Sequence, residues 1–176
     1  MSAPGSRPGT PLALPLPSAR WPHPSFSNDE SYPATPPRRE LGARLAGAAS
    51  AGDLICLRGE LGAGKTQLAK GFGAGLGVTD TISSPSFILM AEYAGRLPLF
   101  HVDLYRLADA SDVVGGGLLD ERQADGVTLV EWPERMGAIL PAARLDITIE
   151  GTGDEPRAIT LRAGNPRLGR YLEMLP

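Results

Sequence analysis

Residues 59–66 read Gly59-Glu60-Leu61-Gly62-Ala63-Gly64-Lys65-Thr66 and match the pattern G-x-x-x-x-G-K-[ST] in full. Glycines at the fixed positions let the backbone turn so that its N–H groups point inward and cradle phosphate oxygens. The ammonium of Lys65 suits the β and γ phosphates, and the hydroxyl of Thr66 suits Mg²⁺. The octapeptide therefore predicts a phosphate-binding loop for a nucleoside triphosphate with Mg²⁺.

The sequence on both sides of this loop supports the same interpretation. Residues 54–57, Leu-Ile-Cys-Leu, form a short apolar run that is typical of a parallel strand covered on both faces. Residues 67–72 have a helical pattern, although glycine weakens it. A strand before the glycine loop and a helix after it are the context that this motif requires. Apolar residues between 41 and 49 predict an earlier helix, which Gly52 should end.

The remaining pattern predicts strands that alternate with short helices. Further strands are expected at residues 87–91, 99–103, 127–131, 145–149 and 158–162, and helices near residues 111–114, 118–122 and 168–174. The last two strands flank Gly151-Thr152-Gly153-Asp154, which predicts a hairpin. We therefore expect an α/β fold: a P-loop NTPase-like sandwich with a mostly parallel central sheet and a C-terminal antiparallel hairpin.

Composition narrows the class of protein. The 176 residues carry a formal net charge of −3, which argues against wrapping nucleic acid by bulk charge. No stretch approaches 18 uninterrupted apolar residues, so a membrane span is not expected. Cys56 is the single cysteine of the sequence, so no internal disulfide can form, and a reducing cytoplasm fits best.

Proline is concentrated at the N-terminus. Ten of the 17 prolines lie in residues 1–37, too many for a helix or a central strand to persist there. We expect residues 1–24 to form a disordered, proline-rich tail and residues 25–176 to form the P-loop ATPase domain. A signal peptide does not fit, because Pro15 breaks the short apolar run at residues 12–16. A proline-rich docking ligand remains an alternative to a passive tail.

The base and the acids can also be approached from the sequence. Guanine recognition in the common GTPases uses Asn-Lys-x-Asp, but neither Asn28 nor Asn165 is followed by lysine, so ATP is the expected nucleotide. P-loop catalysis needs an acid at the end of a neighbouring strand. Glu131 ends the apolar run 127–131, and Asp103 ends the run 99–103. An acid at the carboxyl end of a buried strand faces the ligand crevice, so both are candidates.

Four nearby features allow more than one interpretation. The segment Ser83–Phe87 follows the P-loop helix and is either a switch that senses the γ-phosphate or a plain turn. Trp132 either walls the site, serves a partner surface or packs in the core. His101 is read as an ordinary strand residue in preference to a proton shuttle, and Cys56 as a core residue.

Several blocks together resemble one family, the TsaE family of bacterial ATPases. The blocks are residues 59–66, residues 84–87 (Ser-Pro-Ser-Phe), residues 101–107 (His-Val-Asp-Leu-Tyr-Arg-Leu) and residues 129–134 (Leu-Val-Glu-Trp-Pro-Glu). The resemblance covers roughly residues 38–163. It implies a small P-loop ATPase that works with TsaB and TsaD, while TsaC makes the activated threonylcarbamoyl-adenylate. Together these proteins modify adenosine 37 of tRNAs that read codons beginning with A.

The resemblance also implies roles for individual residues. Leu61 to Thr66 would bind ATP, with Gly59 and Glu60 completing the loop. Thr66 and Glu131 would hold Mg²⁺, and Asp103 would place the metal or the attacking water. Ser86 would belong to the switch segment, Arg157 would lie near the nucleotide, and the catalytic residues would be Lys65, Asp103 and Glu131. The family usually has threonine where Ser86 stands, and the hydroxyl is kept. In this reading ATP hydrolysis resets the complex between cycles, and tRNA is contacted only through the complex.

Two other functions use the same loop. A small-molecule kinase would need an acceptor pocket and a lid, for which the 110 residues after Thr66 leave little room. A non-catalytic, nucleotide-gated interaction module would depend on the bound state of residues 79–87 and not on hydrolysis. For an ATPase, Arg106 and Arg135 are candidate arginine fingers, but a partner could supply one, so we expect slow turnover by the chain alone.

Overall fold

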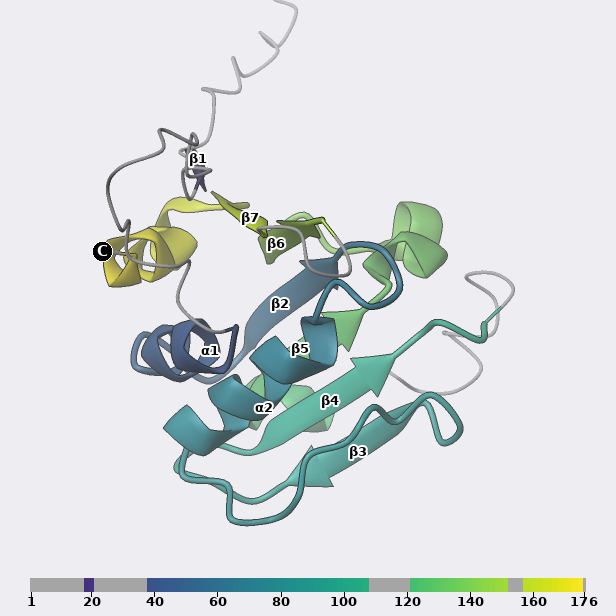
Figure 1. Ribbon diagram of the computed structural model, residues 1–176. Helices are drawn as coiled ribbons and strands as arrows, with labels where there is room; N and C mark the ends of the chain where they lie inside the picture. Colours follow the sequence, from purple (N-terminus) through teal and green to yellow (C-terminus); the bar gives the residue numbers. More distant parts are fainter. Residues whose placement is uncertain (1–17, 21–37, 108–120, 152–156, 176) are drawn as a thin grey trace, which may run out of the picture.

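The computed structural model describes residues 18–20, 38–107, 121–151 and 157–175 (Figure 1). The described strands form a seven-stranded sheet in the order β1-β7-β6-β2-β5-β4-β3. The strands are β1 Ser18–Arg20, β2 Asp53–Arg58, β3 Met90–Tyr93, β4 Leu99–Asp103, β5 Val127–Glu131, β6 Leu145–Glu150 and β7 Ala158–Ala163. The helices are α1 Arg38–Ala46 and α2 Lys65–Gly75, and three 3-10 segments follow: η1 Glu121–Asp125, η2 Pro133–Ile139 and η3 Pro166–Met174.

The centre of the sheet is parallel and its flanks are antiparallel. Strands β6, β2, β5 and β4 run parallel to one another, whereas β3 pairs antiparallel with β4 and β7 pairs antiparallel with β6. The expected α/β fold and its C-terminal hairpin are therefore confirmed. Parallel strands end at the same edge of a sheet, so the loops that follow β2, β4 and β5 meet there.

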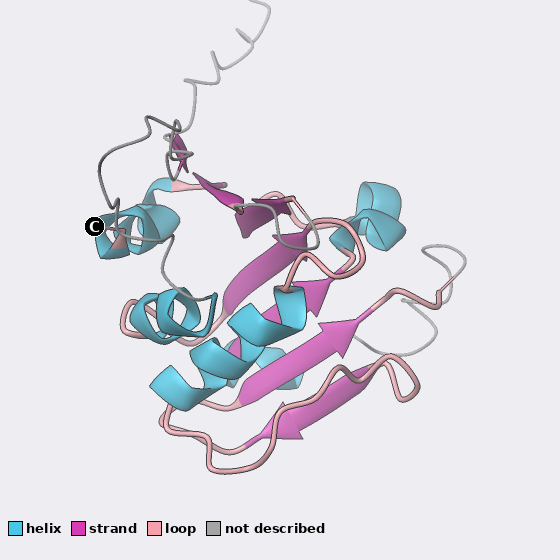
Figure 2. Ribbon diagram, viewed as in Figure 1, coloured by secondary structure: helices cyan, strands magenta, loops and turns pink. Residues whose placement is uncertain are grey.

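Both faces of the central strands are covered, as their continuous apolar runs predict. Helices α1 and α2 pack on one face, and their side chains join a large core with alternate strand residues such as Ile55 and Leu57 (Figures 1 and 2). The intervening residues Leu54 and Cys56 face the other way, into a smaller cluster with Met136 of η2. The strand that leads into the phosphate loop is thus fixed from both sides.

Helices α1 and α2 approach each other very closely at glycine. A Cβ on Gly71 of α2 would stand 2.5 Å from the Cα of Arg39 in α1, and a Cβ on Gly42 would stand 2.7 Å from the backbone nitrogen of Phe72. Real Cβ atoms essentially never come that close to backbone. Glycine in α2, which weakens the helix by propensity, is therefore required by its contact with α1.

A buried acid at the start of β2, Asp53, holds the C-terminal 3-10 helix η3 against the sheet. Asp53 accepts hydrogen bonds from the Tyr171 hydroxyl at 2.7 Å and from the Ser50 backbone N–H at 2.9 Å. Arg170 forms an ion pair with the same carboxylate. These contacts hold η3 against the amino end of β2, at the edge of the sheet opposite the phosphate loop.

Four expectations need correction. The strand expected at residues 87–91 begins at Met90, because the Pro85 carbonyl accepts the N–H groups of Ile88 and Leu89 and folds this stretch into a turn. The helix expected at 168–174 is the 3-10 helix η3, which starts at Pro166 and contains Gly169, a poor α-helix former. The helix expected over 41–49 already ends at Ala46, before Gly52.

The fourth correction concerns the N-terminal tail. Within residues 1–24, expected to lack structure, Ser18–Arg20 forms β1 and pairs antiparallel with β7. These three residues contain no proline, so each retains the N–H group that a strand at the sheet edge requires. Three expected segments lie outside the described residues: the remainder of 1–24, the helix at 111–114 and the first part, 118–120, of the helix expected at 118–122. Residues 121–125 form η1. No helix in the described part of the chain has the length and apolar character to cross a bilayer.

Candidate functional site

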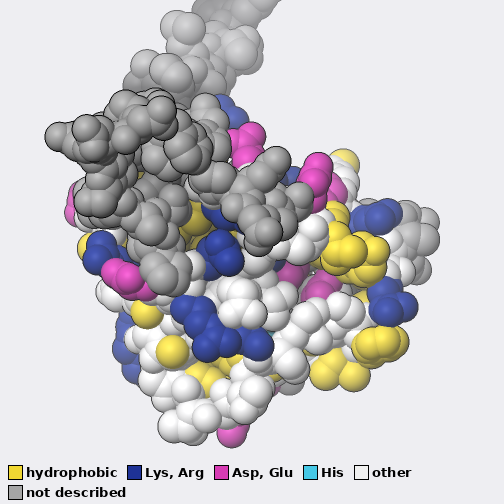
Figure 3. All heavy atoms as spheres, in the orientation of Figure 1, with side chains coloured by type: hydrophobic (Ala, Val, Ile, Leu, Met, Phe, Trp, Pro, Cys, Tyr) yellow, Lys and Arg dark blue, Asp and Glu magenta, His cyan; other side chains and the backbone are white. Residues whose placement is uncertain are grey.

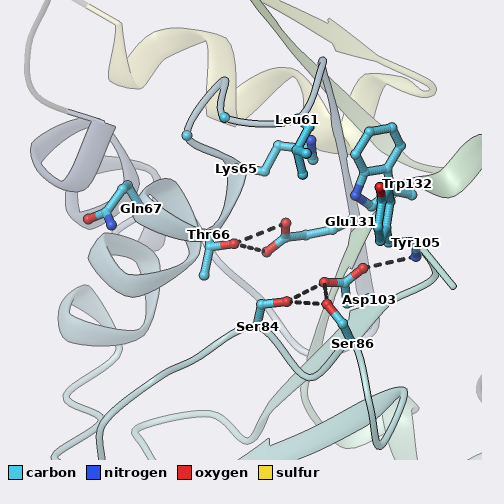
Figure 4. Close-up of a pocket in the computed structure, with 12 residues that line it drawn as sticks. Leu61, Lys65, Thr66, Gln67, Ser84, Ser86, Asp103, Tyr105, Glu131 and Trp132 are labelled. Atoms are coloured by element: carbon cyan, nitrogen blue, oxygen red, sulfur yellow. Dashed lines mark hydrogen bonds between the residues drawn. The ribbon is translucent and has the colours of Figure 1, made fainter. Parts of the chain in front are cut away.

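A cavity of about 370 Å³ opens at the edge of the sheet where β2, β4 and β5 end (Figure 4). It lies between the phosphate loop, the start of α2 and the loops after β4 and β5. Its lining residues are Leu61, Gly62, Gly64, Lys65, Thr66, Gln67, Ser84, Ser86, Asp103, Tyr105, Glu131 and Trp132. The structure therefore brings most of the predicted site residues together in one pocket.

The phosphate loop has the backbone that its glycines permit. Gly62 has φ +82° and Gly64 has φ +105°, in the left-handed region where a side chain is strained. Gly64 is the N-cap of α2 and supplies no side-chain cap, and its carbonyl accepts the Leu68 N–H at 3.1 Å. The earlier N–H groups of α2 have no intrahelical acceptor, so this end of the helix suits a phosphate.

Lys65 is held at the mouth of this loop. Its ammonium donates to the carbonyls of Gly59 at 2.7 Å and Glu60 at 2.9 Å, and it lies 3.9 Å from the centroid of the Trp132 ring. Burial lowers the pKa of Lys65, while the carboxylates of Glu131, Glu134 and Asp103 oppose that shift. The side chain is only 5% exposed, so its positive charge acts in a poorly screened environment.

Thr66 and Glu131 meet across the floor of the pocket. The Thr66 hydroxyl lies 2.9 Å from Oε1 and 3.2 Å from Oε2 of Glu131 (Figure 4). Oε1 also lies 2.9 Å from Nε2 of His101, whose side chain is completely buried. A hydroxyl and a carboxylate in contact at the start of α2 are the donor pair that Mg²⁺ uses beside a triphosphate.

Asp103 organises the segment that follows α2. Its Oδ2 accepts hydrogen bonds from the hydroxyls of Ser84 and of Ser86, the latter at 2.6 Å. Its Oδ1 accepts the backbone N–H of Tyr105 at 2.9 Å. Both carboxylate oxygens of Asp103 are therefore engaged, and the two serines are tied to the strand end instead of turning outward.

The two acids are neighbours in the sheet. Asp103 and Glu131 are paired residues in the parallel register of β4 and β5, and Leu57 of β2 pairs with Glu131 on the other side. Both carboxylates are almost fully buried. Asp103 and Glu131 therefore lie side by side at the carboxyl ends of β4 and β5, and both line the pocket.

Other predicted residues lie beside the pocket without lining it. The backbone of Gly59 and Glu60 binds Lys65, and Ala63 is buried under the loop. Arg157 stands directly before β7 next to the end of β6, on the same edge of the sheet, but it is not among the residues that line the pocket.

The sequence assigned no role to two of the lining residues, Gln67 and Tyr105. Ser84 was expected only as a member of the switch candidate Ser83–Phe87, and in the structure it shares Asp103 with Ser86. Tyr105 follows two residues after Asp103, and its ring lies 5.0 Å from that of Trp132. Gln67 follows Thr66 and accepts a hydrogen bond from Arg39 at 2.8 Å.

Trp132 walls the site and also packs against the core. Its backbone is left-handed, with φ +60°, an outlier for so bulky a residue. This turn directly after Glu131 carries the ring over the Lys65 ammonium, while the ring also contacts the smaller apolar cluster. Strained backbone of this kind is concentrated at functional sites.

Exposed apolar side chains border the pocket. Leu61, Phe87, Ile88 and Tyr105 are all exposed, and Phe87 reaches 83% exposure although it is a large aromatic residue. The Arg106 guanidinium stacks 4.1 Å from the centroid of the Phe87 ring. Figure 3 shows apolar side chains gathered on the side of the molecule where β4 and β5 end.

The donors present fit Mg²⁺ better than a metal held entirely by protein. Within the described residues there is no group of three or more His, Cys, Asp or Glu side chains that could hold an ion. Mg²⁺ usually takes one or two carboxylates and completes its shell with phosphate oxygens and water. Thr66, Glu131 and the nearby Asp103 are a set of this kind.

Comparisons with known proteins agree with this geometry. A family model described as "Threonylcarbamoyl adenosine biosynthesis protein TsaE" matches residues 34–159. The chain is 46% identical over 136 residues to the tRNA threonylcarbamoyladenosine biosynthesis protein TsaE of Bacillus subtilis, covering 76% of this chain and 82% of that protein. It is 43% identical over 130 residues to the protein of that name from Streptomyces coelicolor, covering 70% and 88%.

A solved structure is similar over nearly its whole length. The crystal structure of Bacillus subtilis YdiB aligns with a TM-score of 0.66 and 34% identity, covering 92% of this chain and 95% of that chain. The family model thus covers the phosphate loop and both acids. This chain belongs to the TsaE family of P-loop nucleotide-binding proteins.

Proposed function

We propose that this chain is the ATP-binding and ATP-hydrolysing subunit of the bacterial machinery that makes threonylcarbamoyladenosine at position 37 of tRNA. In this proposal it acts with TsaB and TsaD, and its hydrolysis of ATP resets their complex between cycles. The names of its relatives support the pathway, and the observation that carries the activity is the contact of Thr66 with Glu131 beside the glycine loop.

Binding follows from the loop and the start of α2. The N–H groups at the helix terminus and the Lys65 ammonium neutralise the phosphates, and the left-handed glycines leave room for phosphate oxygens to approach the backbone. Lys65 exchanges its two carbonyl partners for phosphate oxygens in this proposal, because a charged acceptor binds an ammonium more strongly than a neutral carbonyl.

Hydrolysis needs a water molecule aligned with the γ-phosphorus. Oxygen from water forms the new P–O bond, the bond to the ADP oxygen breaks, and the proton of the attacking water leaves to solvent or phosphate. Thr66 and Glu131 would hold Mg²⁺, which supplies positive charge to the β and γ oxygens. Asp103 would orient water through the Ser84–Ser86 segment, since its Oδ2 already organises both hydroxyls.

Partner dependence is part of the proposal. Among the described residues that line the pocket there is no arginine, and Arg38 lies against Gly64 of the loop, so in this proposal a partner supplies the cationic finger for the γ-phosphate. Such a finger accelerates related reactions by about 10³–10⁵-fold when a partner supplies it. The exposed rim of Leu61, Phe87 and Ile88 beside the pocket supports docking of a partner at that edge.

The test is phosphate release from Mg-ATP by the purified chain, alone and with TsaB and TsaD. We expect slow turnover alone and strong stimulation by the two proteins together. Fast, partner-independent turnover would contradict the partner dependence. Labelled γ-phosphate that appears on a small molecule instead of in water would favour a kinase. A Glu131→Ala chain that supports many rounds of tRNA modification would favour a non-catalytic, nucleotide-gated module.

A further inference from the structure

His101 is a buried polar residue to which the proposed function assigns no task. It lies on β4, two residues before Asp103, and its side chain is 0% exposed. Its Nε2 lies 2.9 Å from Oε1 of Glu131, while its Nδ1 is buried without a hydrogen-bond partner among the described residues. The hydrogen-bonding capacity of the ring is therefore directed at one acceptor, the carboxylate of Glu131.

The geometry fixes which ring nitrogen carries the proton in a neutral imidazole. A carboxylate can only accept, so Nε2 must donate its N–H to Glu131, and Nδ1 is left as an unpartnered lone pair. A buried polar atom without a partner costs free energy that an apolar side chain at the same position would avoid. Packing alone therefore does not explain a histidine at this position.

The contact constrains the side chain that hydrogen-bonds β5 to α2 through Thr66. In the parallel register His101 pairs with Leu129, and Asp103 pairs with Glu131, so all four side chains project from the same face of the sheet, toward α2. Oε1 of Glu131 is then held between the His101 N–H and the Thr66 hydroxyl. Two fixed donors on one oxygen set the rotamer of the carboxylate.

We propose that His101 is a positioning residue, whose Nε2–H orients the Glu131 carboxylate for the metal and water beside Thr66. This inference rests on the proposed function, because it assigns to Glu131 the work described there. Outer partners that orient a metal-binding side chain typically change metal affinity or activity by about 10–100-fold when they are removed.

The first test compares two substitutions in the full-length chain. His101→Leu removes the donor and also the unpartnered Nδ1, so it should fold, whereas His101→Gln keeps an amide N–H at comparable reach. For His101→Leu we expect kcat to fall by about 10–100-fold while the KM for ATP changes by less than about threefold. We expect a higher Mg²⁺ concentration for half-maximal rate and substantial recovery of kcat in His101→Gln.

Two results would overturn the inference on kinetic grounds. One is a His101→Leu chain with kcat within about twofold of the unsubstituted chain. The other is a His101→Gln chain that is as slow as His101→Leu, with the thermal stability of both chains lowered. That result would show that His101 supports folding and does not position Glu131.

A second test does not depend on turnover. The sequence has two histidines, His23 and His101, so the ring nitrogens can be assigned by comparing spectra of the ¹⁵N-histidine-labelled chain with those of His101→Gln. We expect the Nε2–H tautomer for His101 and a changed Nε2 shift in Glu131→Ala. An Nδ1–H tautomer would overturn the inference even if the chain hydrolyses ATP. An unsubstituted chain that neither binds nor hydrolyses ATP would instead overturn the proposed function, whatever the tautomer.

Discussion

The closest approach of α1 and α2 gives a prediction about stability and the site together. In Gly71→Ala, the new Cβ would stand 2.5 Å from the Cα and 2.6 Å from the carbonyl carbon of Arg39. Ordinary contacts begin near 3.4 Å. The Arg39 carbonyl oxygen lies closer still, and because the obstacle is backbone and not a movable side chain, α1 and α2 must separate by more than about 1 Å to accommodate it.

The magnitude follows from two opposing effects. Overpacking of a well-packed interface costs about 1–3 kcal/mol and occasionally more, and the absence of a movable side chain places this site at the upper end. Alanine favours the helix by about 1 kcal/mol over glycine. The net loss is about 2 kcal/mol in the free energy of unfolding, which corresponds to a fall in Tm of about 4–8 °C for a chain of this size.

The assay is thermal and urea unfolding, with Gly169→Ala as the matched control. A Cβ on Gly169 would meet nothing within 4 Å, so that substitution should change stability by less than about 0.5 kcal/mol. Phosphate release by Gly71→Ala should also fall, since α2 carries Thr66 to its contact with Glu131. A Gly71→Ala chain as stable as Gly169→Ala would refute the reasoning.

Four further outcomes are expected. Lys65→Ala should weaken Mg-ATP binding by about 30-fold or more in calorimetry, because loss of a buried charged partner costs about 2–5 kcal/mol. A near-normal affinity would contradict the assignment of Lys65 to triphosphate binding. Glu131→Ala should keep most of its ATP affinity while phosphate release falls by about 100-fold or more; if hydrolysis persists, Asp103 becomes the preferred acid. Tyr171→Phe should lower the free energy of unfolding by about 1.5–3 kcal/mol, since Asp53 loses a hydrogen bond, and should leave ATP affinity unchanged in the same calorimetric titration. Burial raises the pKa of Cys56 from 9.0 to about 12, so as the pH rises the unfolded chain loses this thiol proton before the folded chain does. The free energy of unfolding should therefore decline between pH 9 and pH 12. Urea unfolding at each pH should show a smaller decline for Cys56→Ala.

Much of the site was predictable because most of its residues belong to short, continuous sequence motifs. The glycine loop fixes the turn between strand and helix, and two apolar runs that end in a carboxylate place Asp103 and Glu131 at strand ends. Parallel pairing then makes them neighbours. Strands β4 and β5 have the predicted bounds because buried parallel strands leave a continuous apolar signature.

The remaining features depend on contacts between distant segments. The start of β3 is set by the Pro85 carbonyl, which draws Ile88 and Leu89 into a turn despite their strand-like residue types. The left-handed Trp132 and the sharing of Asp103 by two serines have no periodic signature either. From the sequence alone, the glycines of α2 argue against a helix. The close packing of α1 on Gly71 explains why glycine is needed there, and this contact joins two segments that the sequence pattern does not connect.

Arg38, the first residue of α1, lies against the phosphate loop, and a Cβ on Gly64 would stand 2.5 Å from its Nε. Tyr171, near the other end of the described chain, is bonded to the beginning of β2 at the opposite edge of the sheet. The start of α1 and the end of η3 are thus unequal sites for inserting a reporter or an affinity tag. A label inserted directly before Arg38 would lie beside the phosphate loop, whereas one inserted after Met174 would lie at the opposite edge of the sheet.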